Sequence, residues 1–126
     1  MTDANLIAIR EVSEVIERYD QLFNECKVDE LVQIYGPDAA FVHVGKTGGV
    51  GRAAFKDAFE KFNKLGKMIT TPTNRRLDAV GDHVIHRGDY VTTCDGVPEF
   101  HGVFEQVFRK ENNTWHIILD EYTGNF

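Results

Sequence analysis

The feature that most limits how this 126-residue chain can fold is a change in the spacing of its apolar residues. Near the start of the chain these residues recur every three or four positions, which is the spacing of one face of an α-helix. After residue 67 the spacing changes to every second position, which is typical of strands with one buried face. The first pattern predicts a long amphipathic helix over 4–26, with an apolar stripe formed by Ile9, Val12, Ile16, Tyr19, Phe23 and Cys26.

Two further helices and one short strand are predicted between these two regions. A helix over 28–35 ends at the turn residues Gly36-Pro37-Asp38. The β-forming run 39–44 follows and is predicted to be a strand. Helical spacing then returns over 52–66, with an aromatic edge formed by Phe55, Phe59 and Phe62.

Spacing of two predicts a run of strands in the second half of the chain. Pro72 lacks a backbone N–H donor, so the first of these strands is expected at an edge of the sheet. Asp95-Gly96 is a strong hairpin signal between the second and third strands. The expected strands span residues 68–80, 83–94, 100–109 and 114–122. Helices followed by strands predict one α+β domain over residues 1–126, with helices on one face of a mostly antiparallel sheet.

Charge and hydropathy argue against several classes of partner. The chain has 14 basic and 20 acidic side chains and a net charge of −6, whereas nucleic-acid binding starts from a basic surface. We therefore expect no nucleic-acid partner. No apolar run approaches the ~20 residues that cross a bilayer, and the first residues lack the basic start of a secretory signal. We expect no membrane partner and a cytoplasmic location.

The motifs predict no metal and no other cofactor. His83 and His86 lie three residues apart on a predicted strand, so their side chains point to opposite faces. The chain has no His-x-x-x-His or Cys-x-x-Cys pair of the kind that binds zinc. Gly45-Lys46-Thr47 does not form a phosphate-binding loop, because Ala40 stands where that motif needs an earlier glycine.

The order of the predicted elements and three short motifs resemble one known superfamily. The motifs are the stretch RYDQLF at 18–23, IYGPDA at 34–39 and Gly51-Arg52. Together they are similar to the nuclear transport factor 2-like (NTF2-like) superfamily, closest to its ketosteroid isomerase and SnoaL-like branch. The resemblance implies a cone-shaped, cystatin-like fold in which three helices pack against a strongly curved, mostly antiparallel sheet. It also implies a cavity between the helices and the sheet.

The resemblance further implies three catalytic positions. It identifies Tyr19 as a hydrogen-bond donor and places His43 where the family has an aspartate that acts as general base. The third position holds an aspartic acid that donates a hydrogen bond. It falls on Glu105 when the strand is aligned from the preceding hairpin, and on Gln106 when it is aligned from Arg109. Side chains alternate along a strand, so only one of the two can face the cavity.

The two alignments have different consequences for the outer face of the sheet. With Glu105 inward, His101 and Val103 also face the cavity, and the rings of Phe104 and Phe108 lie outside. Exposed rings on that face favour a homodimer packed through it. The other alignment buries both rings and removes this argument. The residues expected to bind a small apolar molecule in the cavity are Phe23, Phe59, Phe62, His86, Tyr90, Gln106, Asp120 and Tyr122.

Three functions are compatible with these patterns. The first is an isomerase or cyclase that carries out enolate acid–base chemistry on a small apolar ketone. In this enzyme His43 takes a proton from carbon, while Tyr19 and either Glu105 or Gln106 donate hydrogen bonds to the oxygen. The second is a non-catalytic carrier that uses the same cavity. The third is a protein-interaction module of the nuclear transport factor 2 type.

Overall fold

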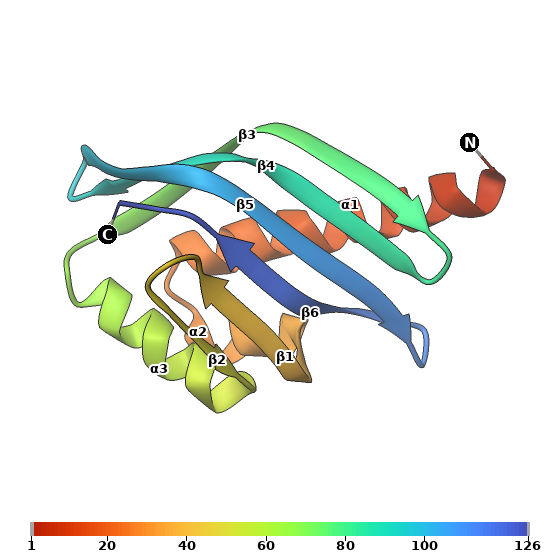
Figure 1. Cartoon of the computed structure of the whole chain (residues 1–126), viewed down its shortest axis with the longest axis horizontal. Coiled ribbons are helices and arrows are strands. Elements are labelled where there is room, and N and C mark those ends of the chain that lie inside the picture. The colour runs from red at the N-terminus through yellow and green to blue at the C-terminus, as the bar shows by residue number, and fades with distance from the viewer. Residues whose placement is uncertain (1, 126) are drawn as a thin grey trace.

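Three helices lie against one curved, six-stranded sheet in the computed structural model, which describes residues 2–125 (Figure 1). The helices are α1 (Asp3–Asn24), α2 (Val28–Leu31) and α3 (Arg52–Asn63), with a short 3-10 helix η1 (Val32–Ile34) after α2. The strands are β1 (Tyr35–His43), β2 (Thr47–Val50), β3 (Met68–Val80), β4 (His83–Cys94), β5 (Val97–Glu111) and β6 (Thr114–Tyr122). This arrangement confirms the predicted α+β class.

Helix α1 forms where the apolar spacing predicted it, except that Cys26 lies beyond its end and is exposed. Of the predicted stripe, Val12 and Ile16 are buried, and Tyr19 and Phe23 are partly buried against the core. Thr2 caps its start, because the Thr2 side chain accepts a hydrogen bond from the Asn5 backbone N–H at 3.1 Å. The helix ends at Asn24, since Cys26 has a positive φ of 59° that an α-helix does not allow. None of the helices within residues 2–125 has the length and apolar character that a membrane span requires.

The sheet has the strand order β2-β1-β6-β5-β4-β3. All neighbouring strands are antiparallel except β1 and β6, which run parallel. Strand β3, which contains Pro72, lies at an edge as predicted. The opposite edge is β2, which was not among the predicted strands. Gly49 is needed there, since a side chain at this position would meet the ring of Phe41 at 2.8 Å.

The predicted helix over 28–35 is wrong in its second half. The α-helix ends at Leu31, and Tyr35 is already the first residue of β1. Tyr35 is 1% exposed, because it packs against Phe55 of α3 with the ring centroids 4.0 Å apart. This buried aromatic contact therefore stabilises Tyr35 as part of β1 and not as part of the preceding helix.

A β-bulge near the start of β5 decides which of its side chains face the helices. Pro98 pairs with Thr93 and Phe100 pairs with Thr92, so Glu99 between them has no partner on β4. One extra residue turns every later side chain to the opposite face of the sheet. His86 consequently pairs with Gln106, whereas a ladder counted from the hairpin without a bulge pairs it with Glu105.

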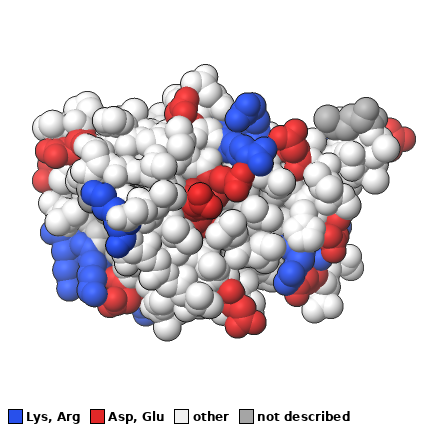
Figure 2. Space-filling view, viewed as in Figure 1, with Lys and Arg blue, Asp and Glu red and all other residues white. Residues whose placement is uncertain are grey.

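The alignment that turned Glu105 inward is therefore wrong, and the one that turns Gln106 inward is correct. Phe104 faces the helices and Phe108 is completely buried, so these rings give no support to a homodimer. The outer face carries smaller apolar side chains instead, among them Val103, which is 51% exposed. Figure 2 shows acidic and basic side chains next to each other in the middle of the view. On the outer face of the sheet Arg87 and Glu105 form an ion pair.

The helices cover the inner face of the sheet from two sides. Helix α1 packs against β3 and β4, while α3 packs against β1 and β2. A continuous apolar core joins them, formed by side chains that include Val12, Ile16, Phe55, Phe108, Trp115 and Ile117. Beyond this core the helices and the curved sheet diverge and leave a cavity.

The register of β5 can be tested by truncating one residue on each face. Phe108→Ala should lower the free energy of unfolding by about 3–5 kcal/mol, because it removes a fully buried ring from the core. Val103→Ala, on the outer face of the same strand, should cost less than about 1 kcal/mol. Urea unfolding of both variants measures the difference. Equal losses, or a larger loss for Val103→Ala, would contradict the register.

Candidate functional site

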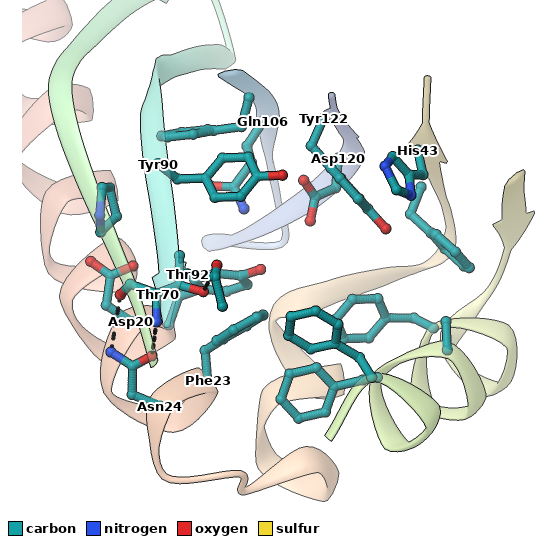
Figure 3. A pocket seen from close by; sticks show the side chains of 18 of the residues that line it. Asp20, Phe23, Asn24, His43, Thr70, Tyr90, Thr92, Gln106, Asp120 and Tyr122 are labelled. Carbon is teal, nitrogen blue, oxygen red and sulfur yellow. Dashed lines mark hydrogen bonds between the residues drawn. The ribbon is translucent and has the colours of Figure 1, made fainter. Parts of the chain in front are cut away.

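A cavity of about 670 Å³ lies between the sheet and helices α1 and α3. This volume is typical of sites that bind small molecules. Phenylalanine rings form its helical wall, and Phe23 meets Phe59 edge-on with the ring centroids 4.9 Å apart. Polar side chains of the sheet form the opposite wall, and Figure 3 shows Tyr90, Gln106 and Asp120 across the cavity from Phe23. One wall can therefore bury apolar surface while the other binds polar groups.

The central polar group of the sheet wall is the carboxylate of Asp120 on β6. Asp120 is 6% exposed and accepts a hydrogen bond from the Tyr35 hydroxyl at 2.5 Å. The Tyr19 hydroxyl lies 3.0 Å from the Tyr35 hydroxyl and also bonds to Asp120. Because Tyr35 uses its own proton on Asp120, the single Tyr19 proton is shared between the Tyr35 oxygen and the Asp120 carboxylate. The Gln106 side chain also bonds to Asp120, and a carboxylate only accepts, so the Gln106 NH₂ group donates.

Burial gives this carboxylate an unusual pKa. Loss of water raises the pKa of Asp120 to about 6, although the hydrogen bonds from Tyr35, Gln106 and Tyr19 act in the opposite direction. Burial also raises the pKa values of Tyr19 and Tyr35 well above their ordinary value, and the nearby charge of Asp120 adds to this effect. Both phenols therefore stay protonated and act as hydrogen-bond donors at neutral pH.

His86 on β4 extends the same network to a third strand. Its Nδ1 lies 3.0 Å from the Oε1 of Gln106, the amide oxygen on the other side from Asp120. The ring is 2% exposed, and burial lowers the pKa of His86 to about 4. It is therefore neutral at pH 7. Its second nitrogen, Nε2, is buried without a hydrogen-bond partner in the part of the chain that the structure describes.

A second polar cluster lies between α1 and the sheet, nearer to the rim of the cavity. Asn24 closes two hydrogen bonds with the backbone of Thr70, at 3.2 and 2.9 Å (Figure 3). The hydroxyls of Thr70 and Thr92 lie 2.7 Å apart. Asp20 and Arg75 form an ion pair between α1 and β3 at the rim. These contacts fix α1 onto the sheet and hold the cavity open beside them.

His43 lies at the end of the cavity where the C-terminal residues cross the sheet. Its ring stacks on Tyr122, with the centroids 4.9 Å apart, and its Nε2 is 3.3 Å from the carbonyl oxygen of Gly124. The Tyr90 hydroxyl donates a hydrogen bond to the carbonyl oxygen of Thr123. The last described residues therefore contact two of the polar side chains that line the cavity, His43 and Tyr90.

The structure brings most of the predicted site residues to one surface. Tyr19, Gln106 and Asp120 are joined by hydrogen bonds, and His43 lies beside Tyr122 on the neighbouring strand. The cavity is lined by each of the residues predicted to bind the small molecule, namely Phe23, Phe59, Phe62, His86, Tyr90, Gln106, Asp120 and Tyr122. Their roles in binding or catalysis stay predictions.

Glu105 does not belong to this surface. The bulge at Glu99 turns it to the outer face, where its Oε1 accepts a hydrogen bond from the Arg87 Nε at 2.6 Å. The geometric reason for a catalytic role of Glu105 is therefore lost. Sequence reasoning also missed Tyr35, which holds Asp120 in place. Gly36-Pro37 directly after it signalled that the helix ends before Tyr35, because a helix rarely continues into such a pair, but it gave no sign that the Tyr35 hydroxyl binds Asp120.

The described residues contain no ready-made metal centre. Within residues 2–125, no three His, Cys, Asp or Glu side chains lie together in a way that could hold an ion. The polar groups that bond to one another are instead a carboxylate, an amide and a neutral imidazole of the sheet, together with two phenols, Tyr35 of β1 and Tyr19 of α1. Such a set can move protons and bind oxygen atoms of a ligand.

Comparisons with known proteins agree with this architecture. The family model described as a SnoaL-like domain matches residues 12–119. None of the curated proteins matches the chain.

Several solved structures have the same fold at low sequence identity. An NTF2-like protein with a cystatin-like fold from Novosphingobium aromaticivorans is 20% identical, with a TM-score of 0.83, over 94% of this chain and 82% of that one. A "Putative Scytalone Dehydratase" from the same organism is 19% identical, with a TM-score of 0.85, over 100% and 89%. A "putative dehydratase" of the NTF2-like family from Streptomyces avermitilis is 14% identical, with a TM-score of 0.79, over 93% and 95%.

The raised pKa of Asp120 predicts how stability depends on pH. Because the folded-state pKa of about 6 lies above the unfolded value, the stability that the Asp120 proton contributes is complete below about pH 4 and is lost as the pH rises through 6. Asp120→Asn carries no charge at any pH. The free energy of unfolding of the wild type, relative to this variant, should therefore fall by about 2 kcal/mol between pH 4 and pH 7.

Urea unfolding of both proteins at several pH values measures this difference. His86 titrates in both proteins, so its contribution to the pH dependence cancels. A difference that stays constant from pH 4 to pH 7 would show that Asp120 has an ordinary pKa in the folded state.

Proposed function

The chain belongs to the SnoaL-like domain family of the NTF2-like superfamily, and from this premise we propose that its cavity carries out acid–base chemistry on a small, mainly apolar ketone. Asp120 is the proposed general base and Tyr19 the proposed donor to the ketone oxygen. The proposal rests above all on the buried Asp120 carboxylate at the cavity surface, whose pKa is raised to about 6.

Asp120 suits the removal of a proton from carbon for two reasons. With a pKa of about 6 it is mostly ionised at neutral pH, yet it is a stronger base than an ordinary aspartate. General bases work best when their pKa lies near the working pH. The hydrogen bond from Tyr35 fixes one carboxylate oxygen, Oδ2, so Tyr35 acts as a positioning residue.

Tyr19 suits the stabilisation of the oxygen that becomes negative. It lines the cavity, and burial keeps its hydroxyl protonated. A ketone oxygen placed beside Tyr19 can accept the hydrogen bond that the hydroxyl otherwise shares between Tyr35 and Asp120. Removing one donor of this kind from an enzyme typically lowers the rate by 10²–10³-fold.

Two reactions share the same first step in this site. In both, Asp120 takes a proton from the carbon next to the carbonyl group and an enolate forms. In an isomerisation of a β,γ-unsaturated ketone, the protonated Asp120 returns the proton to the γ-carbon. In a dehydration of a β-hydroxy ketone, the enolate expels hydroxide, which takes the proton from Asp120 and leaves as water. The two solved structures whose names contain "dehydratase" favour testing the second reaction together with the first.

His43 remains a second candidate for the base, because the family resemblance places a base at this position. It lines the cavity next to Tyr122. The His43 ring stacks on Tyr122 and lies beside the carbonyl oxygen of Gly124, whereas three hydrogen-bond donors, Tyr19, Tyr35 and Gln106, act on Asp120, whose pKa is raised to about 6. This difference is why we assign the base to Asp120.

A non-catalytic carrier is the second candidate function. The phenylalanine wall formed by Phe23, Phe59 and Phe62 favours it, since these rings can bury an apolar ligand without any help from Asp120. A carrier of this type binds ketones and leaves them unchanged.

The catalytic proposal predicts the appearance of a conjugated enone. When a β,γ-unsaturated ketone or a β-hydroxy ketone is added to the protein, the enone absorbance should grow with time. Asp120→Asn should slow this reaction by about 10²–10⁴-fold, because the general base is lost. Tyr19→Phe should slow it by about 10²–10³-fold.

Glu105→Gln is the matched control, because Glu105 lies on the outer face and does not line the cavity. It should keep the full rate. If His43→Asn lowers the rate of enone formation more than Asp120→Asn does, the general base is His43 and not Asp120. If no enone forms from either compound while both raise the melting temperature, the carrier function replaces the catalytic one.

A further inference from the structure

One buried nitrogen of His86, Nε2, indicates which polar group a ligand of the cavity must carry. His86 lines the cavity, yet its Nε2 has no hydrogen-bond partner among the described residues. Buried polar atoms are nearly always paired, and leaving one unpaired is costly. The partner is therefore expected from outside the chain, and the cavity is the place from which it can come.

The hydrogen-bond network determines what that partner must be. Asp120 accepts only, so Gln106 turns its NH₂ group toward Asp120 and its Oε1 toward His86. Oε1 also accepts only, so the Nδ1 of His86 carries the ring proton. In a neutral imidazole the other nitrogen then has no proton and can only accept. The charge on Asp120 thus makes His86 Nε2 an acceptor, two strands away.

The neutrality of His86 supports this assignment. Burial keeps the pKa of His86 far below neutral pH, and the guanidinium of Arg75 acts in the same direction. Charged groups facing the ring come from β3, through Arg75, and from β6, through Asp120 beyond Gln106. The edge of Phe104 packs against the ring, with the centroids 4.8 Å apart, and adds no polar group.

We infer that the ligand of this cavity carries a hydroxyl group or an N–H group that donates a hydrogen bond to His86 Nε2. This donor lies at the other end of the ligand from the ketone, whose oxygen binds Tyr19 and whose neighbouring carbon faces Asp120. This inference rests on the proposed function, which places the ketone at Asp120. It narrows the ligand class from a plain apolar ketone to a hydroxylated one.

The sheet geometry sets the size of such a ligand. His86 and Asp120 lie on either side of Gln106 in neighbouring strands, so their backbones are two strand spacings, or about 10 Å, apart. A molecule with two fused rings, a carbonyl group at one end and a hydroxyl group at the other spans this distance. The phenylalanine wall opposite the sheet can cover the face of such rings.

Two fluorescent probes separate this inference from its alternatives. They are 6-hydroxy-2-acetylnaphthalene, which has a donor at the far end, and 6-methoxy-2-acetylnaphthalene, which has only an acceptor there. The wild type should bind the hydroxy compound at least about tenfold more tightly. His86→Leu should remove this preference. His83→Leu, a matched control at a histidine of the same strand that does not line the cavity, should keep it.

Nitrogen NMR of the wild type gives a second readout that does not depend on a folded variant. The His86 Nε2 signal should be that of an unprotonated nitrogen, and the hydroxy compound should shift it while the methoxy compound does not. Equal binding of both probes, a preference that survives His86→Leu, or a protonated Nε2 would overturn the inference. Neither probe is a substrate of the proposed reactions. Absence of enone formation in the assay of the proposed function therefore leaves the expected binding preference in place and counts against the proposed function alone.

Discussion

The site depends on one buried negative charge, the carboxylate of Asp120. A carboxylate that loses water is stable only where other donors replace the lost hydrogen bonds. Tyr35 at the start of β1 and Gln106 on β5 provide them, and Tyr19 of α1 supports Tyr35. The charge therefore ties a helix and three strands together. Because the loss of water outweighs these bonds, the carboxylate keeps an unusually strong tendency to take a proton.

The same charge sets the direction of the hydrogen bonds that run from Asp120 through Gln106 to His86. It makes Gln106 a donor on one side and an acceptor on the other, and it thereby selects the ring proton of His86. The phenylalanine wall also affects the polar groups opposite it. Apolar rings keep water away from part of the cavity, and electrostatic interactions are stronger where water is excluded. The proposed proton transfer by Asp120 and the proposed preference of His86 for a donor group therefore both follow from one buried carboxylate beside an aromatic wall.

The sequence predicted those features that depend on local spacing. The stripe through Val12 and Ile16 placed α1, and Pro72 placed β3 at an edge. The bulge at Glu99 was not predictable from the hairpin signal, because an extra residue in one strand leaves no mark in local composition. The alternation of Phe104, Gln106 and Phe108 was a better guide to the inward face than the hairpin was. The role of Tyr35 could not be derived, since it depends on contacts with residues distant in sequence.

The central claim is that Asp120 takes up its proton near neutral pH in the folded protein. Carbon NMR of the carboxyl group, with the signal assigned by its absence in Asp120→Asn, measures this directly. The account predicts a titration midpoint close to pH 6. A midpoint near pH 4, the ordinary value for an aspartate, would contradict it.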